Sequence, residues 1–80
     1  MKYQQRRIYQ ILSQYPSSGT YPKAIRYYES HMSKAEIQVH LDSLLQMNLI
    51  GKNKDYQGIS YYRVLSIREI AKIKLIHEKG

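Results

Sequence analysis

The sequence predicts a single, mostly α-helical domain with one β-hairpin, an α+β fold in the order helix, helix, helix, hairpin, helix. Apolar residues recur at helical spacing in three segments before residue 48 and again after residue 66, and this spacing indicates amphipathic helices. Between them, residues 49–52 and 59–65 are rich in β-branched and aromatic residues, which is typical of strands. Because the chain has 80 residues, we expect one domain over residues 1–80.

The first helix is expected over residues 2–15, which are good helix formers. It ends before residues 16–19, where proline and glycine together indicate a loop. Its apolar positions share one stripe, which predicts a face that packs on the core. These positions are Ile8, Ile11, Leu12 and Tyr15.

A second, short helix is expected to begin at Pro22. Proline fits the first turn of a helix because the backbone N–H that it lacks would have no partner within the helix there. We expect Ile25 and Tyr28 to face inward, and Arg26 and Glu29 to point away from the core.

The third helix begins with a capping box, in which Ser33 is followed three residues later by Glu36. Asn48 is expected to end it, since asparagine tolerates the left-handed conformation that commonly stops a helix. The apolar stripe between these two signals predicts the buried face. It consists of Ile37, Leu41, Leu44 and Leu45.

Two strands are expected next, over residues 49–52 and 59–65, with the polar residues 53–58 as the tip of the hairpin. A second capping box, formed by Ser66 and Glu69, predicts a last helix over residues 66–79.

The composition favours a nucleic-acid partner. Thirteen Lys and Arg against six Asp and Glu give a formal charge of +7, and a basic excess attracts polyanions. There is no cysteine, so a disulfide framework or thiolate metal site is not expected. The chain has nine tyrosines but no Phe and no Trp, and we expect most of the tyrosines to be half-buried. Neither a signal peptide nor a membrane span is expected, which predicts a cytoplasmic protein.

Residues 6–65 resemble bacterial and archaeal winged helix-turn-helix regulators, of the arsenic-sensor and multiple-antibiotic-resistance repressor type. In that pattern a capping Ser precedes a β-branched core residue, a His-Leu pair, a Leu and a Gly-Leu-Ile motif. Asn48 stands where the family usually has glycine, and Tyr61–Val64 resembles the returning strand of the wing. The matching positions are Ser33, Ile37, His40, Leu41, Leu44, Leu49 and Ile50.

The resemblance implies a protein that binds double-stranded DNA and regulates transcription, with repression expected. An α-helix fits the major groove of B-DNA, where its outward side chains reach base edges. The outward side of the third helix, opposite its apolar stripe, predicts the base-reading residues Lys34, Ala35, Gln38, Val39, Asp42 and Ser43. Gln38 is expected to pair with an adenine edge. The residues expected on the DNA backbone are Lys23, Arg26, Lys52, Asn53, Lys54 and Tyr56, with a contribution from Arg6 or Arg7.

The last helix predicts a homodimer. Its apolar residues spread beyond the stripe of about 100° that one contact face needs. We expect one side to pack on the first helix and the other to meet a second subunit, the alternative being a helix folded wholly onto its own domain. The isoleucines expected at the dimer interface are Ile67, Ile70, Ile73 and Ile76.

An enzyme is not expected, because His31, His40 and His77 lie in different elements without carboxylates or cysteines at ligand spacing. No metal, cofactor or small-molecule effector is expected either. Two alternatives stay open. Glu36 and Asp42 make the outer face of the third helix partly acidic, which favours a winged helix that binds protein. A plasmid or viral replication or partition factor would bind DNA without controlling transcription.

Overall fold

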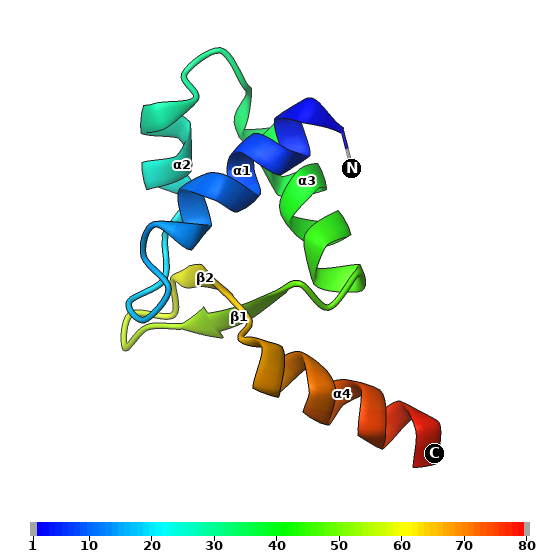
Figure 1. Ribbon diagram of the computed structural model, residues 1–80. Helices are drawn as coiled ribbons and strands as arrows, with labels where there is room; N and C mark the ends of the chain where they lie inside the picture. Colours follow the sequence, from blue (N-terminus) through cyan, green and yellow to red (C-terminus); the bar gives the residue numbers. More distant parts are fainter. Residues whose placement is uncertain (1, 80) are drawn as a thin grey trace.

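The computed structural model describes the backbone of residues 2–79 and the side chains of residues 2–73. Within these residues, four helices and one two-stranded antiparallel hairpin follow one another (Figure 1). This confirms the α+β class and the predicted order of elements. The elements are α1 (Tyr3–Ser13), α2 (Pro22–Tyr28), α3 (Lys34–Gln46), β1 (Ile50–Lys54), β2 (Ser60–Val64) and α4 (Ile67–Lys79).

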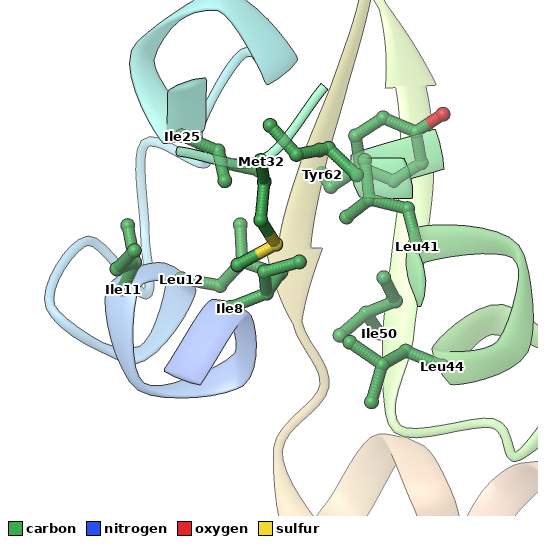
Figure 2. Close-up of a cluster of buried hydrophobic side chains, with 10 residues drawn as sticks. Ile8, Ile11, Leu12, Ile25, Met32, Leu41, Leu44, Ile50 and Tyr62 are labelled. Atoms are coloured by element: carbon green, nitrogen blue, oxygen red, sulfur yellow. The ribbon is translucent and has the colours of Figure 1, made fainter. Parts of the chain in front are cut away.

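The core lies where α1, α2, α3 and the hairpin meet (Figure 2). The predicted stripes of α1 and α3 supply most of it, and α1 packs against both α3 and β2. Met32, in the connection between α2 and α3, completes the core from a loop. The buried apolar residues are Ile8, Ile11, Leu12, Ile25, Met32, Ile37, Leu41, Leu44, Ile50 and Tyr62, with Leu45 partly buried against them.

The first helix is shorter than predicted and ends at Ser13. Tyr15, expected in its apolar stripe, is exposed. The residue before a proline is disfavoured in the helical conformation, so Pro16 forces the chain out of the helix before Tyr15 can join the buried face.

Both ends of α3 form as predicted. The Glu36 backbone N–H donates to Ser33 Oγ at 3.1 Å, and the Ser33 N–H donates to Glu36 Oε1 at 3.3 Å. Asn48 has a φ of 57°, the left-handed conformation expected after the helix. These local signals therefore fix where α3 starts and stops.

The hairpin pairs Ile50 with Val64 and Lys54 with Ser60, so the first strand runs two residues further than expected. The loop is correspondingly shorter, and Asp55 holds it together. Its Oδ1 accepts the backbone N–H groups of Gln57 and Ile59, each at 2.9 Å.

A third segment, which the sequence did not predict, pairs with the free edge of β2. Thr20 N–H donates to Tyr62 O at 2.7 Å, and Tyr62 N–H donates to Thr20 O at 2.9 Å. This one-residue bridge ties the chain just before α2 to the hairpin. The start of α2 is therefore held next to β2.

The prediction for the end of α2 was wrong. Glu29, expected to point away, is only 7% exposed, whereas Tyr28, expected to face inward, is 47% exposed. The helix ends at Tyr28, and the backbone of Glu29 leaves the helical conformation with φ −123° and ψ 65°. Its carboxylate turns inward and pairs with the Arg7 guanidinium and with His31 Nε2 at 3.2 Å.

The last helix is anchored at its first turn and then leads away from the other elements (Figure 1). The Ser66–Glu69 capping box forms, and Arg63 on β2 donates to both carboxylate oxygens of Glu69, at 3.1 and 2.8 Å. The expectation that one side of this helix packs on the first helix was wrong for the described residues, which show no packing between α1 and α4. The side chain of Ile76 lies outside the described part of the chain.

The Arg63–Glu69 pair predicts a pH-dependent anchor for α4. The hydrogen bonds from Arg63, with help from the Ser66 N–H, lower the pKa of Glu69 from 4.5 to about 2. The contribution of the Arg63–Glu69 pair to the stability of the fold is therefore fully present above pH about 4.5 and is lost as the pH falls toward 2. We expect an NMR titration of the Glu69 carboxyl to give a midpoint near 2. In Arg63→Gln the midpoint should rise toward 4.5, whereas the neighbouring Arg68→Gln should leave it unchanged. A midpoint near 4.5 in the unsubstituted chain would contradict the anchor.

Two glycines with positive φ make a matched pair for a second prediction. Gly19 has a φ of 78°, and a Cβ there would lie 2.7 Å from Tyr61 Cδ2. Gly58 has a φ of 81°, and nothing lies within 4 Å of its Cβ position. We expect Gly58→Ala to lower the free energy of unfolding by about 1 kcal/mol, the cost of a left-handed alanine. Gly19→Ala should cost at least about 1 kcal/mol more, because of the clash. Equal losses in urea denaturation would show that Tyr61 moves aside freely.

Candidate nucleic-acid interface

An open groove of about 1130 Å³ lies between α2, the start of α3 and the hairpin. Four of the side chains that line it are cations: Lys23 and Arg26 from α2, Lys34 from α3, and Lys52 from β1. We call this feature the basic groove. Its other lining residues are Tyr21, Pro22, Ala24, Tyr27, Gln38, Asp55, Tyr56, Gln57, Ile59, Ser60 and Tyr62.

Asp55 is the one carboxylate among the residues that line the basic groove, and it is already hydrogen-bonded. Besides the two loop N–H groups, it accepts a hydrogen bond from the Tyr21 hydroxyl, at 2.9 Å from Oδ2. The Ile59 N–H contributes most to holding the pKa of Asp55 below its ordinary value, with further contributions from Tyr21 and the loop. The hydrogen bond between the Tyr21 hydroxyl and Asp55 also raises the pKa of Tyr21. Asp55 thus ties the hairpin loop to the residue before α2.

The structure brings six of the predicted site residues together. Among the expected backbone contacts, Lys23, Arg26, Lys52 and Tyr56 line the basic groove. Of the expected base-reading residues, Lys34 and Gln38 line it. Residues far apart in the sequence therefore present their polar groups to one space.

The other predicted residues lie outside the basic groove. On α3, Ala35, Val39 and Asp42 are exposed and Ser43 is partly exposed, with Val39 at 65%. On β1, Asn53 and Lys54 are exposed. The N-terminal arginines differ from each other, because Arg6 is exposed whereas Arg7 is paired with the buried Glu29. The charge of Arg7 is thus already compensated within the fold.

The sequence prediction missed the tyrosines of the basic groove. We expected most tyrosines to be half-buried, but six of the nine are exposed. Tyr27 and Tyr56, both on the groove, are 82% and 94% exposed. The ring of Tyr27 is supported by an edge-on contact with Tyr28, with ring centroids 5.6 Å apart. The absence of Phe was the available signal, since an exposed aromatic residue benefits from a hydroxyl that reaches water or a phosphate.

The side chain of Gln38 is held in place across the edge of the basic groove. Its Nε2 donates to Asp42 Oδ1 at 2.9 Å, one turn further along α3, and to the Tyr62 hydroxyl at 3.1 Å. Tyr62 belongs to the core, with only 1% of its surface exposed. The orientation of Gln38 is therefore set by both its own helix and the hairpin.

Neither comparison with known proteins finds a relative: the sequence matches no protein-family model and no curated protein. Within the described part of the chain, no three side chains of His, Asp or Glu come together as metal ligands would. The side chain of His77 is not among those described. The helices described here are all too short or too polar to span a bilayer.

Proposed function

We propose that this chain is a winged helix protein that binds double-stranded DNA as a homodimer and regulates transcription, most simply by repression. The observation that carries the proposal is the convergence of Lys23, Arg26, Lys34 and Lys52 on one groove, from three separate elements. Lysine and arginine that meet phosphates release counterions from DNA, and this release supplies much of the affinity.

The arrangement of the elements supports a specific docking geometry. The outer face of α3 enters the major groove, where an α-helix fits. Lys23 and Arg26 at α2, with Lys52 and Tyr56 on the hairpin, then lie against the phosphates on either side. The loop carrying Tyr56 is held to the start of α2 by Asp55 and Tyr21, so both flanks are fixed relative to α3 before DNA arrives.

The main rival is a winged helix that binds protein through the acidic residues of α3. Glu36 is bonded to the N–H of Ser33 in the capping box, and Asp42 accepts the amide of Gln38. Each carboxylate thus already accepts one hydrogen bond within the molecule, and the four cations of the basic groove outnumber these two acids. This balance of charge favours DNA over a basic protein as the partner. A replication or partition factor would share the DNA contacts and differ only in where its sites lie.

The dimer is proposed to form through α4. Ile67 is 88% exposed, and Ile70 and Ile73 are partly exposed, with no cover from α1. We expect sedimentation equilibrium to give twice the 9.5 kDa of one chain. Ile73→Asp should shift it to the monomer, because a dimer would bury the new carboxylate. The control is Lys72→Asp at the exposed neighbouring position, which should leave the mass unchanged. A monomer in both the unsubstituted chain and the control would contradict this interface.

Selection from a pool of random duplexes tests the function itself. A dimer with two α3 helices on one face of DNA should enrich an inverted repeat, with half-sites about 34 Å apart, or one helical turn. Pools that remain random after several rounds, while the protein is folded, would contradict sequence-specific binding.

A further inference from the structure

The donor groups of Gln38 are already used within the protein. Asp42 carries a carboxylate, which only accepts hydrogen bonds, so the Nε2 of Gln38 must be the atom that faces it at 2.9 Å. An amide nitrogen has two protons, and the second points to the Tyr62 hydroxyl at 3.1 Å. The amide oxygen, Oε1, is left as the group with which Gln38 can bind something else, and it can only accept.

An oxygen that only accepts distinguishes bases in a simple way. In the major groove, adenine and cytosine present amino donors, N6 and N4, whereas guanine and thymine present only acceptors, at O6, N7 and O4. We propose that Gln38 reads amino against keto bases. It accepts from adenine N6 or cytosine N4 on the contacted strand and rejects guanine and thymine. This inference rests on the proposed DNA-binding function and concerns the chemistry of its specificity.

The proposal replaces the expected adenine contact, which uses both ends of the amide. Such a glutamine accepts from adenine N6 and donates to adenine N7 at the same time. Here the donor would first have to leave Asp42 or Tyr62. The bond to Asp42 is a favourable pair at i and i+4 on the same helix, and Tyr62 is fixed in the core. Asp42 is therefore a positioning residue that acts on base choice through Gln38.

Four proteins compared in one selection experiment test this reading: the unsubstituted chain, Gln38→Ala, Asp42→Ala and Asp42→Asn. At one position in each half-site, the unsubstituted chain should enrich adenine and cytosine about equally, and each over guanine or thymine by roughly tenfold. Gln38→Ala should lose this preference and still select the same bases at the other positions of the half-site. In Asp42→Ala the freed Nε2 donor of Gln38 should reach adenine N7, so that adenine is enriched more than cytosine. Asp42→Asn keeps a carbonyl oxygen that can accept from Gln38, and should restore the original pattern.

A modified base gives the sharpest readout. Replacing adenine at that position with 7-deazaadenine removes N7 and leaves N6. The unsubstituted chain should bind the modified duplex within about twofold of the parent, since N7 takes no part, whereas Asp42→Ala should lose roughly tenfold. A merely structural role for Asp42 would weaken every duplex alike and would not create this sensitivity.

The failures of the two proposals are distinguishable. If the unsubstituted chain enriches adenine alone and loses affinity on 7-deazaadenine, Gln38 uses both ends of its amide and this inference is overturned, while the DNA-binding function stands. A Gln38→Ala profile identical to the unsubstituted one also overturns it. If no sequence is enriched at all, the proposed function fails and the inference falls with it.

Discussion

The variant in which Lys23, Arg26, Lys34 and Lys52 are all replaced by alanine should bind duplex DNA at least about a thousandfold more weakly at 0.15 M salt. All four cations line the basic groove. Each phosphate contact contributes about 0.9 to the slope of log affinity against log salt, so the eight contacts of a dimer contribute about 7.2. We expect the slope of the variant to be shallower by that amount, in anisotropy titrations at several salt concentrations.

A control with the same change in charge separates the groove from the overall charge. Lys2, Arg6, Arg68 and Lys72 are exposed and do not line the basic groove. Replacing these four with alanine should leave the salt slope nearly unchanged and weaken binding far less. If both variants lose affinity equally, the net charge of +7 attracts DNA without a defined contact surface.

Leu41→Ala should lower the free energy of unfolding by about 2–5 kcal/mol. Leu41 is fully buried on the inner side of α3, in the buried cluster to which α1, α2 and the hairpin also contribute (Figure 2). Truncation loses buried apolar area and leaves a cavity that a close-packed core fills only in part. Because small domains are marginally stable, a loss of this size leaves a large fraction unfolded at 37 °C. Urea denaturation at one fixed protein concentration measures the change, since the proposed dimer would add a concentration-dependent contribution.

Val39 gives the matched control on the same helix. It lies on the outer side of α3 and is 65% exposed, so Val39→Ala should change the free energy of unfolding by less than about 0.5 kcal/mol. Similar losses for Leu41→Ala and Val39→Ala would mean that α3 does not present these two faces as described. The pair therefore tests which side of α3 is available to a partner.

The parts of the fold that could be predicted from the sequence depend on local chemistry. The capping boxes at Ser33 and Ser66 need only a residue three positions away, and both form. The left-handed Asn48 likewise ends α3 as predicted. The buried stripes of α1 and α3 follow from a period of 3.6 residues, which needs no knowledge of the partner element.

The errors come from contacts between distant residues. Nothing near Glu29 in the sequence indicates that Arg7, 22 positions away, will hold its carboxylate in the interior. The bridge between Thr20 and Tyr62 has no periodic pattern, because a single residue forms each side of it. For α4, apolar residues on two sides predict that something covers them, but not which element does.

The candidate site could be predicted in part for the same reason. The outward face of α3 follows from its buried face, so Lys34 and Gln38 were found from spacing alone. The cations of α2 and β1 were found from charge and the family resemblance. The contacts that shape the site join residues far apart, as Tyr21 with Asp55 and Gln38 with Tyr62 do. These depend on how the hairpin packs beside α2 and α3, which no local pattern encodes.

The most direct test of a DNA-binding groove is the anisotropy of a labelled random-sequence duplex, titrated with the unsubstituted protein from low to physiological salt. The proposal predicts that log affinity falls linearly with log salt, with a slope steeper than about −3.6, because each subunit of the dimer presents the four groove cations. No binding at low salt would contradict the proposal. The basic groove would then be a solvated surface, and a protein partner for α3 would be the next candidate.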